Sequence, residues 1–335
     1  MPRRASLVIS LVTTAATVAA AACGKGGTPA PTPVPAPTPA QRGSAAGRAG
    51  AAADDTGVAG AGAGSAAAGS GDAGTGAAGS AGAAAALPPH TRHATLAAAL
   101  LATIPTDARV IGFGELHARA DRAQVRSALA AFTEALPSFG ERISDLVVET
   151  WIVDPKCGQK AVTATKKIET DVKRPEATKS EVALLADAAR AAKIQPHAMT
   201  LSCKDYEQLA PEKGAPDLVL MLGLVTRELT RVATSAIRYR DQQPEHRPWI
   251  TLYGGALHND RFPAAAVAEW SYAKAVDQAS QNHYVEIDLI VPEFAEPDPP
   301  SQAQPWFPLA LAADQVLVWK RGERSFVVVL PRTRP

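Results

Sequence analysis

The sequence predicts an α/β domain with a mainly parallel sheet flanked by helices and a C-terminal antiparallel hairpin. Short apolar strands alternate with amphipathic helices between residues 109 and 290, which is typical of strands joined by helical crossovers. The run Leu146–Val148 is apolar throughout, as expected for a parallel strand covered on both faces. Arg321-Gly322 separates the last two strands and indicates a hairpin. We expect one domain, spanning residues 87–335.

The first segment, residues 1–22, is predicted to be a secretory signal of the lipoprotein type. Arg3 and Arg4 precede an apolar run over residues 5–19, and three alanines then precede Cys23. This arrangement looks like a bacterial lipobox, in which Cys23 becomes the lipidated first residue of the mature protein. An ordinary signal peptide, cut just before the cysteine, is the alternative.

A tether is predicted over residues 23–86, which are almost wholly Ala, Gly, Pro, Ser and Thr. Its early part, 28–39, has a proline every two or three residues and is expected to be extended polyproline II. Gly24 stands where an inner-membrane retention signal would have aspartate. We therefore expect a protein of the bacterial cell envelope, anchored to the outer membrane by lipid on Cys23.

The charge of the chain is nearly balanced, with 34 Lys and Arg against 33 Asp and Glu. This balance argues against a nucleic-acid partner, which would select a basic surface. Two further cysteines, Cys157 and Cys203, are expected to form a disulfide in an oxidising compartment. Two independent buried thiols are the alternative, and the spacing does not suit a Cys-x-x-Cys zinc site.

The first half of the domain is predicted to contain two helices and two strands. Residues 95–104 are rich in Ala and Leu and indicate a short helix before the opening strand, 109–113. Apolar residues then recur at three- and four-residue steps over 119–136, which predicts an amphipathic helix. An apolar strand follows at 145–150. Residues 151–175 are rich in Lys, Thr and Asp and are expected to be irregular.

The second half continues the alternation of helices and strands. Apolar periodicity predicts a helix at 180–193. Further helices are expected at 216–240, which has a strongly apolar start, and at 262–278, after Pro263. Strands are expected at 194–201, 249–253, 284–290, 315–319 and 325–330, with a glycine-rich turn at 254–260 and a Pro-rich loop at 292–308. Pro196 cannot donate a backbone hydrogen bond, so its strand is expected to be irregular or near a sheet edge.

Polar residues follow four of the predicted strands, at the edge where open parallel sheets bind ligands. They are Glu115 and His117, then Glu149, then His197, then His258 with Asn259 and Asp260. Gly114-Glu-Leu-His117 and Gly255-Ala-Leu-His258 share the pattern Gly-x-x-His after a buried strand. A carboxylate and an imidazole at such an edge can hold a metal, relay a proton or bind a polar ligand.

These motifs resemble the superfamily that groups ChaN-type haem-binding lipoproteins, Tiki-type metalloproteases and erythromycin-esterase-like hydrolases. The resemblance covers most of residues 105–290 and rests on Gly-Glu-x-His, the Glu that ends the second strand, and the late Gly-x-x-His. It implies that Glu115, His117, Glu149 and His258 line one pocket. The haem-binding branch is nearest in context, because it includes exported lipoproteins.

Structural roles stay open for several of these residues. Glu115 and His117 could cap the next helix, where a carboxylate is favourable. Glu149 ends an apolar strand and needs a partner, which could be Arg119 or Arg261. A histidine within the core is the alternative for His197.

Four residues are predicted to bind the ligand, namely Arg119, Tyr253, Asn259 and Asp260. Tyr253 could instead fill the core, and Asn259 and Asp260 could cap the following helix.

Three functions fit these residues. In a hydrolase, Glu115 or Glu149 would be the general base, with His117 and His258 as second base or stabilisers. A divalent metal held by Glu115, His117 and His258 would lower the pKa of its bound water. A binding protein would hold haem or a related small molecule through one of the two histidines, and a purely structural lipoprotein is the third reading.

Overall fold

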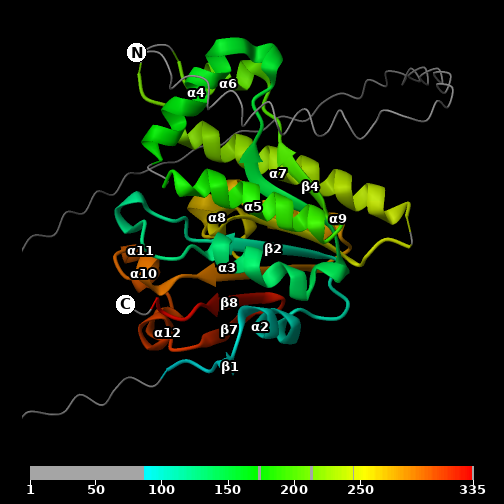
Figure 1. Cartoon of the computed structure of the whole chain (residues 1–335), viewed down its shortest axis with the longest axis vertical. Coiled ribbons are helices and arrows are strands. Elements are labelled where there is room, and N and C mark those ends of the chain that lie inside the picture. Colours follow the sequence, from blue (N-terminus) through cyan, green and yellow to red (C-terminus); the bar gives the residue numbers. More distant parts are fainter. Residues whose placement is uncertain (1–86, 173–174, 212–213, 244, 334–335) are drawn as a thin grey trace, which may run out of the picture. The chain divides into compact units, whose positions relative to one another are not determined.

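A computed structural model describes residues 87–333 except 173–174, 212–213 and 244. Within these residues, eight strands form one sheet in the order β1-β7-β8-β6-β2-β5-β3-β4 (Figure 1). The predicted signal peptide (1–22), Cys23 and the predicted tether (23–86) lie outside the described residues.

The sheet is mostly parallel. Each strand from β8 to β4 in the sheet order runs parallel to its neighbour. Strand β7 is antiparallel to β8, which confirms the predicted hairpin, and β1 is antiparallel to β7. The strands are β1 Thr91–His93, β2 Val110–Glu115, β3 Ile143–Trp151, β4 Gln195–Met199, β5 Trp249–Gly255, β6 Tyr284–Ile290, β7 Val316–Gly322 and β8 Ser325–Val329.

Helices cover both faces of the sheet (Figure 1). One apolar cluster joins α2, α3 and α5 to one face, and a second joins α7 and α9 to the other. The helices are α2 Leu96–Thr103, α3 Ala128–Ala135, α4 Gly158–Asp171, α5 Ala177–Ala191, α6 Cys203–Leu209, α7 Leu218–Asp241, α8 Ala256–Asn259, α9 Ala273–Ala279, α10 Pro292–Ala295, α11 Pro299–Gln302 and α12 Phe307–Ala312. The predicted α/β architecture is therefore confirmed.

The alternation of side chains along β2 shows how the faces are divided. Ile111 and Phe113 belong to the cluster with α3 and α5, whereas Val110 belongs to the cluster with α7. Because successive strand residues point to opposite faces, Glu115 lies on the α3/α5 face and Gly114 on the α7 face.

A helix occupies part of the segment that was predicted to be irregular. Helix α4 runs from Gly158 to Asp171 and buries Ala161, Ala164 and Ile168. These three residues are spaced three and four apart, so the buried stripe is helical. Two of them are alanines, and the surrounding lysines and threonines obscured the stripe in the sequence.

Three other segments differ from prediction. The helix expected over 119–136 begins only at α3, where the Ser127 side chain accepts a hydrogen bond from the N–H of Ala130. The helix expected over 262–278 is a 3-10 turn, Ala265–Trp270, followed by α9. The Pro-rich loop contains α10 and α11 and the start of α12, each with proline in its first turn, where its missing N–H costs nothing.

A disulfide joins Cys157 to Cys203, as predicted, with Cα atoms 5.0 Å apart. Cys157 precedes α4 and Cys203 opens α6, so the bond fixes the beginnings of two helices that pack together (Figure 1). A capping box also secures the start of α6, because Ser202 and Asp205 each bond the other's backbone N–H.

No helix among the described residues is long and apolar enough to cross a membrane.

Removing the disulfide is expected to destabilise the fold. The bond joins residues 46 positions apart. In the chain-entropy model a loop of that size contributes roughly 4 kcal/mol to the free energy of unfolding. Urea unfolding of the wild type with and without reductant should show a loss of that order, and the Cys157→Ser/Cys203→Ser double variant should not respond to reductant. Equal stability in both conditions would contradict this assignment.

Candidate functional site

Three neighbouring strands bring predicted site residues to the carboxyl edge of the sheet. Strand β2 ends at Glu115 and is followed by His117, β3 carries Glu149 near its end, and β5 ends at Gly255. Strand β5 lies between β2 and β3 in the sheet. Glu115, His117 and Glu149 therefore form one cluster, which we call the edge cluster.

Glu115 is buried and both of its carboxylate oxygens are engaged. One oxygen lies 3.0 Å from Nδ1 of His117, and the other accepts a hydrogen bond of 2.6 Å from the Tyr253 hydroxyl. Burial raises the pKa of Tyr253 well above its usual range, and the nearby Glu115 carboxylate raises it further. Tyr253 thus stays protonated and acts as a donor that holds Glu115 in place.

His117 connects acids from opposite faces of the sheet. Its Nε2 lies 3.7 Å from one oxygen of Glu149. The other oxygen of Glu149 accepts a 2.6 Å hydrogen bond from the backbone N–H of Gly255. Val147 points to the α7 face, and Glu149, two residues further along β3, points to the same face. Glu115 lies on the α3/α5 face. The imidazole therefore lies between two carboxylates, past the end of β2.

The two glycines that end β5 make room for this cluster. A Cβ on Gly254 would lie 2.5 Å from the Glu149 carboxylate and 2.8 Å from its Cβ. A Cβ on Gly255 would lie 2.9 Å from Nε2 of His117. Any side chain at either position would displace the acid or the imidazole, so the Gly-Gly pair is required by close approach.

His258 lies on the short helix α8, and its ring is fixed from one side. Its Nδ1 lies 2.8 Å from the carbonyl oxygen of Trp270 and 3.0 Å from the Thr226 hydroxyl. A carbonyl can only accept, so Nδ1 carries a proton. Among the described residues, the ring hydrogen-bonds to Thr226 and Trp270 and not to the edge cluster.

The other predicted ligand-binding residues take separate positions. Arg119 is about half exposed and pairs with Asp121 at 3.0 Å. Asp260 forms an ion pair of 2.7 Å with Arg321. Asn259 is fully buried, and its amide nitrogen donates to the carbonyl of Gly112.

The two arginines considered as partners for Glu149 pair with other carboxylates. Arg261 pairs with Asp277 at 3.1 Å and Arg119 with Asp121. The contacts of Glu149 described above are to His117 and Gly255.

His197 does not lie at the carboxyl edge, contrary to the expectation from sequence. It is the middle residue of β4, beside Val147, and its Nε2 bonds Asp145 at 2.7 Å. Burial acts to raise the pKa of Asp145, but the hydrogen bonds from His197 and Ser144, together with the nearby histidine charges, outweigh it and hold that pKa below its usual value.

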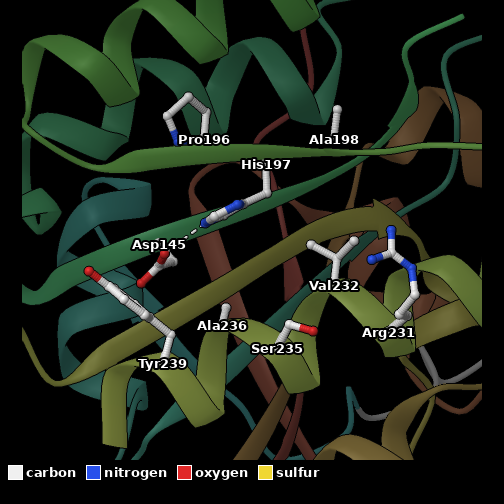
Figure 2. Close-up of a pocket in the computed structure, with 9 residues that line it drawn as sticks. All are labelled: Asp145, Pro196, His197, Ala198, Arg231, Val232, Ser235, Ala236 and Tyr239. Carbon is white, nitrogen blue, oxygen red and sulfur yellow. Dashed lines mark hydrogen bonds and ion pairs between the residues drawn. The ribbon is translucent and has the colours of Figure 1, made fainter. Parts of the chain in front are cut away.

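Figure 2 shows the His197–Asp145 pair in a groove between β4 and α7. The groove has a volume of about 490 Å³, and α7 lines it with Arg231, Ser235 and Tyr239. Strand β4 is at the end of the sheet order, as Pro196 predicted.

Two of the three predicted metal ligands, Glu115 and His117, lie together, whereas the ring of His258 bonds to Thr226 and Trp270. Among the described residues, no group of three or more His, Cys, Asp or Glu side chains is placed to hold a metal ion. Both oxygens of Glu115 are engaged, and Nδ1 of His258 is bound to Trp270.

A further acid at this edge was missed in the sequence. Asp288 lies on β6 directly beside Gly114, one residue from Glu115. The sequence feature that could have revealed Asp288 is the pattern Glu286-Ile-Asp288, which places two carboxylates on one face of a strand that is otherwise apolar.

No family model matches the chain, and no curated protein matches it. Among solved structures, the chain is similar to the type III effector HopBA1, with 11% sequence identity and a TM-score of 0.36. The match covers 72% of this chain and 98% of that chain. A likeness at this level carries no argument about family or function.

Adding a methyl group at Gly254 is expected to disrupt the edge cluster. Because the new Cβ would overlap Glu149, Gly254→Ala should lower the free energy of unfolding by about 1–3 kcal/mol. Gly223→Ala is the matched control, since its Cβ would meet no tertiary neighbour within 4 Å and lies inside α7. That change should stabilise by about 0.5–1 kcal/mol. Urea unfolding measures both, and a Gly254→Ala variant as stable as wild type would contradict the packing described.

Proposed function

We propose that the protein is an acid–base hydrolase that acts on an ester or amide carbonyl, with His117 and Glu149 as its reacting groups. The observation that carries the proposal is the position of His117 between two carboxylates at an open sheet edge. Its ring lies 3.0 Å from Glu115 on one side and 3.7 Å from Glu149 on the other. A histidine side chain about one third exposed can reach both solvent and substrate.

Glu115 is the orienting acid. It accepts a hydrogen bond from the Nδ1–H of His117, so the lone pair of the neutral imidazole is on Nε2. The Tyr253 hydroxyl fixes Glu115 from the opposite side. This division of roles leaves Nε2 as the basic atom, aimed toward Glu149.

A water molecule beside the two bases would be the nucleophile. Nε2 lies 3.7 Å from the Glu149 oxygen, and a water to the side of this pair would donate to either atom. That water would give its proton to His117 or Glu149 while its oxygen adds to the carbonyl carbon. The same proton would then pass to the leaving group as its bond to carbon breaks. His258 is buried, with Nδ1 bound to Trp270, so it takes no direct part in this step.

Binding of haem or a divalent metal is the second candidate function, and the contact of Glu115 with Nδ1 of His117 supports it. A carboxylate on one ring nitrogen orients the other toward a metal. For haem, Nε2 of His117 would be the iron ligand. For a divalent ion, His117 and Glu149 would be the donors, because the oxygens of Glu115 are engaged. A metal bound there would lower the pKa of its water.

We also propose that the protein is exported and lipid-anchored through Cys23 in a bacterial envelope, at the outer membrane. The Cys157–Cys203 disulfide supports export, because such bonds persist in oxidising compartments.

Replacing His117 tests the hydrolase. Across a panel of aryl esters and peptide amides, His117→Gln in the full chain should lower kcat/KM by about 100- to 10,000-fold, the usual contribution of a general base. His93→Gln is the control, since His93 lies on the edge strand β1. Full activity in His117→Gln would contradict the proposal.

Titration with haemin and with Zn²⁺ tests the second candidate. Saturable binding by the wild type that is lost in His117→Ala/His258→Ala, without hydrolysis of the panel, would favour a binding protein. No binding by folded wild type would remove both the haem and the metal readings.

Lipidation is tested by metabolic labelling with a fatty-acid analogue. The wild type and the Cys157→Ser/Cys203→Ser variant should both incorporate the label, whereas Cys23→Ser should not, because the thioether forms on that sulfur. Labelling of Cys23→Ser would contradict a lipid anchor at this residue.

A further inference from the structure

Two buried oxygen atoms converge on Gly114 without a donor between them. Oδ1 of Asn259 and Oδ1 of Asp288 are both buried and have no hydrogen-bond partner among the described residues. They lie 2.5 Å and 2.6 Å from the place where a Cβ on Gly114 would be. Gly114 and Asp288 are also direct partners in the β2–β6 register. Both acceptors border one small buried space, and leaving them without a donor is costly, so a proton is needed there.

Asn259 cannot supply that proton. Its amide nitrogen lies 3.2 Å from the carbonyl oxygen of Gly112, which can only accept. The nitrogen therefore faces Gly112, and the amide oxygen faces Asp288. The missing donor must come from the carboxyl group.

We propose that Asp288 is a neutral carboxylic acid that donates its proton to Asn259 and thereby positions α8, the helix that carries His258. Asp288 is a positioning residue in this assignment. The role of His258 rests on the proposed function, whereas the proton on Asp288 does not.

The charges around Asp288 favour the neutral form. The groups that face it are Glu286 on its own strand, Asp260 after α8, Arg321 on β7, and the hydroxyls of Tyr272 and Tyr284. Arg321, the cation in this set, is already paired with Asp260 at 2.7 Å and Glu286 at 3.1 Å. Burial raises the pKa of Asp288 well above its usual range, and the Glu286 carboxylate raises it further.

The proton completes the attachment of α8 to the sheet. The Tyr284 hydroxyl donates to the backbone oxygen of Asn259 at 2.8 Å, and the Asn259 amide donates to Gly112. A bond from Asp288 would satisfy the remaining polar atom of that side chain. Because α8 is a single turn, holding Asn259 also fixes the neighbouring His258.

The stability of the fold should then fall as pH rises. In the unfolded chain an aspartate ionises near pH 4, whereas folded Asp288 keeps its proton above that pH. The unfolded state therefore loses its proton first, and the folding equilibrium weakens by up to about tenfold per pH unit above about pH 4. Asp288→Asn removes this titration and supplies an N–H donor to Asn259 in place of the O–H.

The experiment compares the full-length wild type with Asp288→Asn, Asp288→Ala and Asp314→Asn, an exposed control. We expect the carboxyl carbon of Asp288 to show its neutral NMR shift at pH 7. The Asp288→Asn variant should be at least as stable as the wild type at pH 7, and its advantage should grow with pH. The His258 ring resonances should be preserved in Asp288→Asn and shifted in Asp288→Ala, and Asp314→Asn should follow the wild type.

An ionised Asp288 at pH 7 would overturn the proposal, as would an Asp288→Asn variant that is less stable than wild type or fails to fold. Unchanged His258 resonances in Asp288→Ala would overturn the positioning role. None of these measurements uses catalytic activity, so a failure of the proposed hydrolase leaves their outcome unaffected.

Discussion

The carboxyl edge of the sheet depends on one imidazole that joins acids from opposite faces. Pleating places Glu115 among the side chains beneath α3 and α5, and Glu149 beneath α7. Two such acids cannot meet across an intact sheet. His117 lies past the end of β2, where the backbone no longer separates the faces, and it contacts both. The site therefore exists only where the strands end.

Small residues and fixed donors then decide how closely these groups approach. Gly254 and Gly255 leave the space that Glu149 and His117 occupy. The Tyr253 hydroxyl and the N–H of Gly255 each hold one carboxylate. All three residues lie in sequence at the end of β5, the strand between the two acids, so a single strand shapes both halves of the cluster. Because β5 is buried throughout, these supports are as rigid as the sheet itself.

Most of the fold could be predicted from local pattern, and so could the part of the site that follows strands. Apolar runs located the strands from β2 to β8, and the ends of two of them, β2 and β3, supplied Glu115, His117 and Glu149. Contacts that depend on tertiary packing could not be predicted from the local sequence pattern. His197 follows a helix–strand pattern like the others, yet its position in the middle of β4 became clear only from register with Val147. Helix α4 was missed because its buried stripe contains alanines, whose hydrophobic signal is weak. Asp288 lay within a strand whose alternation was recognised, but its partner Asn259 comes from a different segment.

The two short segments that follow Gly114 and Gly255 differ in how they are held, and this difference bears on their roles. His117 is held by side chains of the cluster that would do the chemistry, so any change in those acids also moves the base. His258 is held by groups outside the cluster, namely the carbonyl of Trp270 on one side and the attachment of Asn259 to the sheet on the other. The second histidine can therefore keep its position whatever the charge of Glu115 and Glu149. The carboxyl edge therefore has two kinds of support. The contacts of His117 change with the charge of Glu115 and Glu149, and the contacts of His258 do not. The buried hydrogen bonds of α8, with a carboxyl group kept neutral by burial and by Glu286, provide the second kind.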